Sequence, residues 1–235
     1  MFSLMHTVTA NKKFLCFVYI IFSLKVSVVL ANTEVGLRNY KEGEFKKAYE
    51  EFFSESKKGN ANAQYYLGCM FLKGEGVKKS FMWGFKWLSI AADKGHVKAL
   101  NVVGVIYKNG VETSKNTEEA KKYLQLSAEK NFNLGQFNLG VLLIENYKEK
   151  IENLSHENVK QENDDHSNSH SKEENHRTDL IEGYKWLKIS ELNGFDRAST
   201  ILKLLSAEIL HSELIVLDEQ ANEAFKSLKN QNATN

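Results

Sequence analysis

One short pattern recurs every 36 residues in this chain, and it limits the possible folds more than any other feature. Leu67-Gly68 is followed 36 residues later by Val103-Gly104, and after another 36 residues by Leu139-Gly140. Further positions keep the same interval: Ala63, Ala99 and Gly135; Gly84 and Ala120; Trp87 and Tyr123; Leu88 and Leu124; Ala92 and Ala128. Such a period is typical of helical-hairpin arrays, in which one unit cannot bury its apolar face alone.

Each period contains the pattern of two helices. Residues 63–72 carry apolar side chains at helical spacing and lead into the glycines of KGEG, which predict a turn. Ser80 is a plausible N-cap of the second helix, and Gly95 follows its end. Glycine or alanine at the repeated positions lets the two helix backbones approach closely. Trp87 and its equivalents Tyr123 and Trp186 are therefore predicted to be core residues.

The array is predicted to continue on both sides of these copies. Downstream, GYKWLKISELNG at residues 183–194 closely repeats GFKWLSIAADKG at residues 84–95. Trp186 follows Tyr123 by 63 residues, which is one period of 36 plus an insertion of 27. Residues 148–177 are rich in Asn, Glu, Lys and His and poor in large apolar residues, so they are predicted to be a disordered loop.

These observations predict an all-α chain, an α-solenoid of about four to five helix-turn-helix repeats with a C-terminal capping helix. The expected organisation is a signal peptide at 1–31, a first helical hairpin at 32–59, repeats at 60–147, the disordered insertion at 148–177, a last repeat at 178–204, and a capping helix and tail at 205–235.

The N-terminal segment resembles a secretory signal peptide. Lys12 and Lys13 precede an apolar run of 11 residues, FLCFVYIIFSL, and the segment closes on Val29-Leu30-Ala31. Lys25 makes the apolar stretch short for a membrane span, although an uncleaved anchor remains the alternative. Cleavage would leave 31 − 3 = 28 basic against 30 acidic residues, and Cys69 as the single thiol. We expect a periplasmic or secreted bacterial protein with no stable membrane insertion after cleavage.

The repeats resemble the Sel-one-like repeat (SLR) family, relatives of the tetratricopeptide repeat. The family pattern is matched in order by Ala63, Leu67, Gly68, Gly74, Gly76, Val77, Trp87, Ala91, Ala92 and Gly95, with Gly84 at an alanine position. The resemblance covers roughly residues 34–204. The second copy departs from the pattern at Glu112 and Thr113, and the third loses that turn to the insertion. The resemblance implies roles in signalling, envelope processes and host interaction.

The sequence contains no motif that predicts an enzyme. Phosphate-cradling and dinucleotide-binding glycine motifs are absent, and the formal net charge of +1 does not suggest nucleic-acid binding. We therefore expect no catalytic residues, no cofactor and no metal site. His156, His166, His170 and His176 lie in the insertion among carboxylates, where weak zinc or nickel binding is the alternative to a plain hydrophilic loop.

The predicted site is the concave groove formed by the first helices of successive hairpins, where tetratricopeptide-like arrays bind partners. The side chains off the packing positions there are Asn62, Tyr65, Tyr66, Lys98, Asn101, Val102, Leu134, Phe137 and Asn138. Exposed aromatic and amide side chains suit a peptide or a partner helix, although Tyr66 and Val102 could instead pack in the core.

The expected function is that of an exported adaptor or scaffold for another protein or peptide. A secreted host-interaction factor is one alternative. An exported hydrolase of the cysteine-rich SLR type is another, and it is disfavoured because those relatives pair cysteines in each hairpin while the mature chain would have one.

Overall fold

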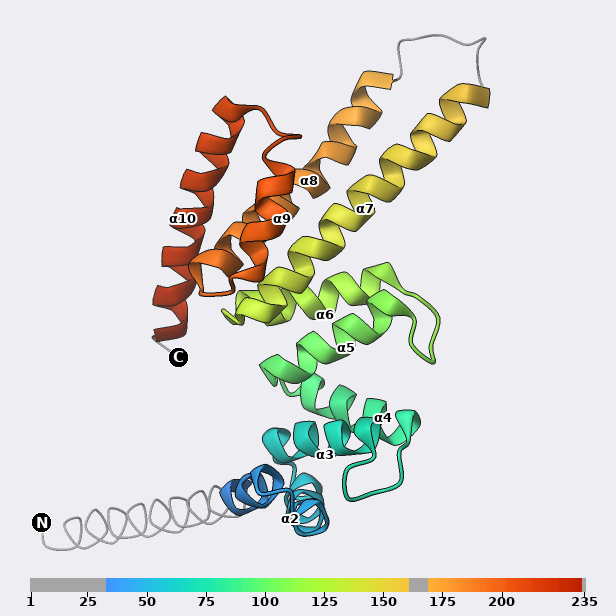
Figure 1. Cartoon of the computed structure of the whole chain (residues 1–235), viewed down its shortest axis with the longest axis vertical. Helices are drawn as coiled ribbons and strands as arrows, with labels where there is room; N and C mark the ends of the chain where they lie inside the picture. Colours follow the sequence, from blue (N-terminus) through green and yellow to red (C-terminus); the bar gives the residue numbers. More distant parts are fainter. Residues whose placement is uncertain (1–32, 161–168, 234–235) are drawn as a thin grey trace, which may run out of the picture. The chain divides into compact units, whose positions relative to one another are not determined.

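The structure is a computed structural model that describes residues 33–160 and 169–233. The chain divides into two compact units, residues 1–91 and 92–235, and each is described by itself below. All regular secondary structure in the described part is helical (Figure 1). A helix over residues 33–41 is followed by α2 (Phe45–Lys57), α3 (Ala61–Lys73), α4 (Phe81–Asp93), α5 (Val97–Asn109), α6 (Thr117–Glu129), α7 (Asn133–Lys160), α8 (Ser169–Leu192), α9 (Arg197–Leu205) and α10 (His211–Ala233).

The all-α fold class is confirmed, and the helices form the predicted hairpins. Five successive helices, α2 to α6, each contain 13 residues. Polar side chains cap the start of three of them. The side chains of Asn60, His96 and Asn116 accept hydrogen bonds from backbone N–H groups three residues on, at 3.0–3.1 Å. Gly74 ends α3 in the left-handed region at φ 80°, where a side chain would be strained.

The first unit is held together by an aromatic core between α2 and α3. Phe52 is fully buried and stacks on Tyr66 with ring centroids 5.1 Å apart. Leu67 and Met70 fill the rest of this core, and Trp87 packs against it as expected. A Cβ at Gly68 would lie 2.7 Å from Leu88 Cγ and 3.0 Å from the Gly84 carbonyl. The repeated glycine is therefore a packing residue that allows α3 and α4 to approach closely.

The second unit repeats this packing with a different side-chain set. Leu124 and Leu139 are buried in one cluster, against which Trp186 packs. Leu187 belongs to a second cluster that continues into α9 and α10. A Cβ at Gly140 would lie 2.7 Å from Leu187 Cγ and 3.0 Å from the Gly183 carbonyl. The same close approach therefore recurs between α7 and α8.

The expected loop at 148–177 differs in the structure. Instead of ending near residue 147, α7 continues to Lys160, and α8 already begins at Ser169 (Figure 1). Lys150 Nζ donates to Asp179 Oδ2 at 2.7 Å, which links the extension of α7 to α8. An existing helix adds residues without a new nucleation cost, so even a polar segment can continue it. The amino-acid composition of the segment did not predict this helical extension. Residues 161–168 lie outside the described residues.

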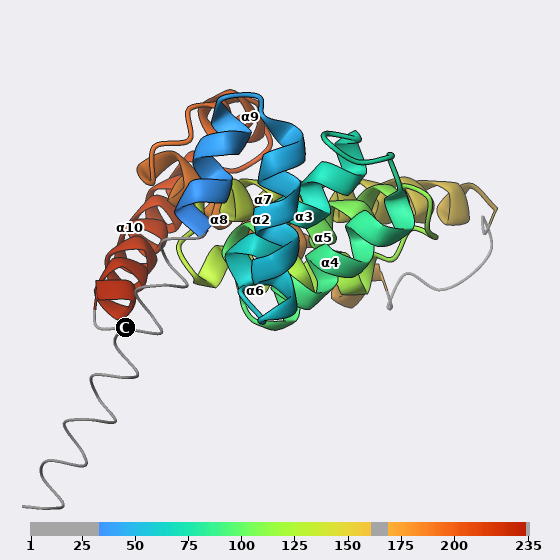
Figure 2. The ribbon, with the colours of Figure 1, turned by 90° about the horizontal axis from the view of Figure 1, so that it is seen from below.

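The C-terminal helix α10 packs along α8, as Figures 1 and 2 both show. Leu217 and Ala221 are buried there. Tyr184 donates its hydroxyl hydrogen bond to Asp218 Oδ1 at 2.8 Å, and burial raises the pKa of this tyrosine. The helix thereby covers apolar side chains that the last repeat would leave in water.

The predicted signal peptide, residues 1–31, lies outside the described residues. Within the described ranges, no helix combines the length and the apolar character that a membrane crossing needs.

Candidate partner-binding site

Six of the nine predicted groove residues lie on α5 and α7, which are neighbours in the second unit. Lys98, Asn101 and Val102 belong to α5, and Leu134, Phe137 and Asn138 belong to α7. Asn138 Nδ2 donates a hydrogen bond to Asn101 Oδ1 at 2.7 Å. The structure therefore brings these six positions together on adjacent first helices.

Two of these six side chains serve packing, which the repeat pattern did not predict. Asn101 is only 5% exposed, because its amide is covered where α5 meets α7. Phe137 packs against Phe195 with ring centroids 4.8 Å apart and adjoins the core cluster of α8 to α10. Asn101 is therefore not available to a partner, and Phe137 is half-buried against the core.

The other four side chains form the accessible part, which we call the α5–α7 face. Lys98 is exposed, and Val102, Leu134 and Asn138 are half-buried. Farther along α5 and α7, Lys108 Nζ lies 2.8 Å from Glu145 Oε1. Lys115, in the turn after α5, places its Nζ 3.4 Å from Glu149 Oε2 of α7. The hydrogen bond between Asn101 and Asn138 and the ion pair between Lys108 and Glu145 link α5 to α7. The face combines two apolar side chains with an amide and a cation.

The remaining three predicted residues lie on α3 in the first unit. Asn62 is exposed and Tyr65 is half-buried, with the Tyr65 ring edge-on to Tyr66 at 5.2 Å. Burial, reinforced by Cys69, raises the pKa of Tyr65, so its hydroxyl stays neutral and can donate a hydrogen bond. Tyr66 stacks on Phe52 and therefore belongs to the core, which was the alternative left open for it.

A polar cluster beside α3 was missed by the sequence reasoning. Tyr40 donates its hydroxyl hydrogen bond to Glu75 Oε2 at 2.5 Å, and Lys73 Nζ donates to the same hydroxyl at 3.0 Å. Burial raises the pKa of Tyr40, and the bond to Glu75 adds to this effect. These residues come from the first helix, the end of α3 and the turn after it. No repeated spacing connects them, so the pattern contained no signal for the cluster.

Two buried glutamines were also missed, and both have a structural role. Gln64 Nε2 donates to the Ser56 carbonyl at 3.0 Å, and Gln136 Nε2 donates to the Ala128 carbonyl at 3.3 Å. The two positions are two periods apart, with Leu100 between them. That spacing was the available signal. Each amide binds the end of the preceding helix to the start of the next.

Among the side chains that the structure describes, no group of three or more His, Cys, Asp or Glu residues is arranged to hold a metal ion. The side chains of the four loop histidines, His156, His166, His170 and His176, lie outside that description. Cys69, which the repeat places at an apolar position, is half-buried next to Tyr65.

Comparison with known proteins identifies the repeat. The family model described as Sel1 repeat matches residues 61–96 and 97–132. These two matches coincide with the hairpins α3–α4 and α5–α6. No curated protein matches the sequence.

Two solved structures are similar to the chain. A Sel1 repeat protein from Oxalobacter formigenes is 24% identical, covers 74% of this chain and 58% of its own, and has a TM-score of 0.55. A protective antigen of uropathogenic Escherichia coli strains that displays an SLR fold is 16% identical, covers 86% of this chain and 56% of its own, with a TM-score of 0.47. The chain thus spans a little over half the length of each. The former supports the fold, and the two matched segments supply the assignment: the chain contains Sel1 repeats, the unit of the SLR family.

Proposed function

We propose that the chain is an exported, non-enzymatic adaptor or scaffold that holds a partner protein or peptide on its first-helix face. SLR proteins generally mediate protein interactions, which supports the class of function. The export signal predicted at residues 1–31 supports a periplasmic or secreted location. The near-neutral charge supports a protein partner over a nucleic acid.

The α5–α7 face is the observation that carries this proposal. Val102 and Leu134 offer apolar contact, while Lys98 and Asn138 offer a cation and an amide beside it. The hydrogen bond between Asn138 and Asn101 fixes the spacing of α5 and α7 before any partner arrives. A preformed surface binds with a smaller ordering cost than a flexible one. This combination suits a peptide or helix with apolar anchors and a carboxylate near Lys98.

The test is site-specific crosslinking from this face. A photoreactive phenylalanine analogue replaces Val102 in the chain that begins at Asn32, and the protein is illuminated in the envelope fraction of its source cells. We expect one or a few defined adducts, and their loss when Leu134→Glu is added. The reason is that a carboxylate in an apolar contact costs roughly 2 kcal/mol or more of binding free energy.

The matched control places the same analogue at Leu126, an exposed apolar residue of α6 outside the face. Adducts that are identical from positions 102 and 126 would show that the face has no specific partner. Adducts from Val102 that persist with Leu134→Glu would place the contact elsewhere on α5. Circular dichroism of each variant checks that the helices remain intact.

A further inference from the structure

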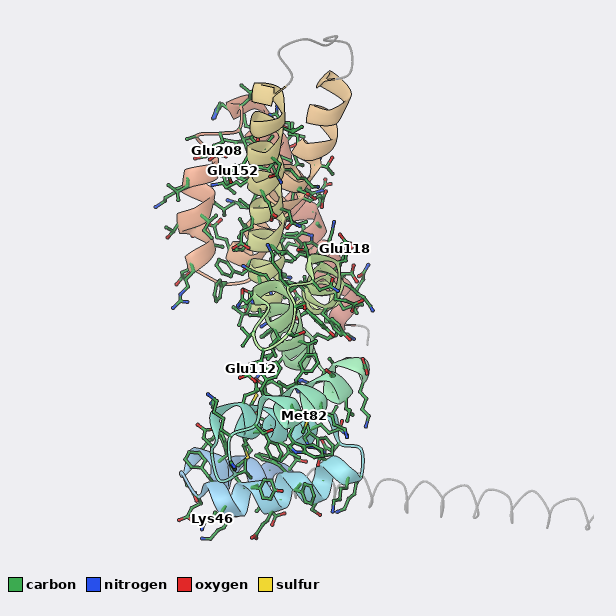
Figure 3. All side chains as sticks on the ribbon, turned by 90° about the vertical axis from the view of Figure 1, so that its right-hand side faces the viewer. Lys46, Met82, Glu112, Glu118, Glu152 and Glu208 are labelled. Carbon is green, nitrogen blue, oxygen red and sulfur yellow. The ribbon has the colours of Figure 1, made fainter. Side chains whose placement is uncertain are left out.

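The start of α4 carries exposed apolar side chains that the fold does not require. Met82 is 67% exposed and Trp83 is 42% exposed. Three exposed lysines, Lys78, Lys79 and Lys86, surround them in the sequence KKSFMWGFK. We call these five residues the Lys-Trp patch. All five lie in the first unit, and Met82 is labelled in Figure 3.

The other repeats provide an internal comparison for this position. One period before and after Met82 stand Lys46 and Glu118, both also labelled in Figure 3. The corresponding neighbours of Trp83 are Lys47 and Glu119. Ordinary charged side chains therefore satisfy the fold at the outer position of a second helix. The Met-Trp pair is a departure at positions where the neighbouring repeats carry charged side chains.

In the local sequence, the charged residues nearest the pair are all lysines. Residues 76–92 contain the three lysines and no Asp or Glu. Across residues 33–160 and 169–233, the ion pairs seen in the structure involve none of Lys78, Lys79 and Lys86. In the neighbouring repeat, the equivalent stretch includes Glu112, Glu118 and Glu119. The lysines of the patch thus keep their charge available for an anionic surface.

The local geometry keeps the aromatic ring and the cations together. Lys86 Nζ lies 4.9 Å from the centroid of the Trp83 ring, within cation–π range. Met82, Trp83 and Lys86 lie in the first turns of α4, where Met82 and Trp83 precede Lys86 by four and three residues and therefore share a side of the helix with it. Lys79 lies just before the helix begins. Phe71 of α3 supports the indole with ring centroids 6.4 Å apart. The result is an apolar centre with lysines before and after it.

We propose that the Lys-Trp patch docks the protein on the surface of an anionic lipid bilayer. Lysines bind acidic headgroups, and each contributes about fivefold in affinity, the equivalent of about 1 kcal/mol. Tryptophan favours the interface between headgroups and acyl chains, because its ring is apolar and its N–H is polar. Methionine adds apolar contact area at the same depth. The patch shares no residue with the α5–α7 face.

The first test measures co-sedimentation of the chain from Asn32, which contains every described residue, with vesicles. One set contains phosphatidylcholine alone, and the other contains equal parts of phosphatidylcholine and phosphatidylglycerol. We expect binding to the anionic vesicles only, and weakening as salt is raised. Lys78→Gln with Lys79→Gln should reduce the affinity about 25-fold, the product of about fivefold for each lysine.

The decisive variant is Met82→Glu with Trp83→Glu, because it copies the residues of the next repeat and should fold normally. We expect it to lose vesicle binding, while Leu126→Glu, an equal change at another exposed apolar site, keeps it. Unchanged binding by the Met82→Glu, Trp83→Glu variant would overturn the proposal. So would a wild type that ignores anionic vesicles, and binding of polyglutamate without binding of vesicles would identify an acidic polypeptide as the ligand.

Discussion

His96 caps α5 through its imidazole ring, whereas the equivalent residue one period earlier is Asn60. The ring accepts a hydrogen bond at Nδ1 from the backbone N–H of Ala99 at 3.1 Å. Burial, reinforced by Lys98, lowers the pKa of His96 to about 4. A protonated imidazole could not accept that bond, so the cap exists only while the ring is neutral. An asparagine cap has no such dependence.

This difference predicts a pH effect at one residue. The folded-state pKa lies below the unfolded value of 6.5, so the stabilisation by His96 is fully present above pH 6.5 and is lost as the pH falls toward about 4. We expect His96→Asn to flatten this part of the stability profile while keeping α5 capped. The measurement is the urea midpoint of both proteins across that range. Parallel profiles would show that His96 does not titrate as described.

Residue identity alone did not reveal which groove positions are accessible. Asn101 and Val102 are neighbours on α5, yet the polar residue is the buried one. Its burial depends on Asn138, 37 residues away, which satisfies its amide. A repeat pattern gives positions on one helix but not the partner across the contact. That is why the predicted groove contained packing residues such as Asn101 and Phe137.

At the scale of the helix pair, the glycine of each first helix sets the distance to the second helix. A Cβ on Gly104 would lie 2.7 Å from Leu124 Cγ and 3.2 Å from the Leu124 backbone nitrogen. Leu124 is fully buried, and a change of its rotamer would not move its backbone nitrogen away. Alanine gains about 1 kcal/mol over glycine in a helix, whereas overpacking costs about 1–3 kcal/mol. Packing therefore outweighs propensity at this contact.

We expect Gly104→Ala to lower the free energy of unfolding by roughly 1–2 kcal/mol in denaturant titration. Gln125→Ala, an exposed change on the facing helix, serves as the control and stays within about 0.5 kcal/mol of the wild type. If Gly104→Ala is instead as stable as the wild type or more so, the glycine is not required for the close approach.

The helices of the repeats were predictable because caps and glycines recur with the apolar pattern. The region near Ala63 to Leu72 corresponds to α3, and the N-cap expected at Ser80 precedes α4, where the Trp83 backbone N–H donates to Ser80 Oγ at 3.4 Å. The long extensions of α7 and α8 were not predictable from composition. Their sequence lacks an apolar stripe, and their helical state follows from the repeat helices that they continue.

At the scale of the whole chain, α10 closes the C-terminal side of the second unit. It buries Leu217 and Ala221 against α8, and Arg177 Nη2 lies 2.6 Å from Glu213 Oε2. Repeat arrays require such capping elements to remain soluble. Removal of α10 would uncover the apolar side of α8 around Tyr184 and Ile189, which are 5% and 3% exposed.

We therefore expect a chain that ends at Ser206 to be less stable and to self-associate. The reason is that several apolar side chains would become exposed at once, each worth about 1.5–3 kcal/mol when buried. Size-exclusion chromatography and binding of a hydrophobic dye would detect this change. A chain that ends at Asn230 is the control and should remain monodisperse. Normal behaviour of the shorter chain would show that α10 is not a structural cap.

One outer position, occupied by Lys46, Met82 and Glu118 in successive repeats, bears on how repeat proteins evolve. The buried positions of each repeat stabilise the fold. The outer position of the second helix carries a cation, a thioether or an anion in successive repeats. Substitutions there change the surface and leave the buried positions in place. One duplicated hairpin can thus acquire a new binding surface through a few mutations, while the neighbouring hairpins keep their own surfaces.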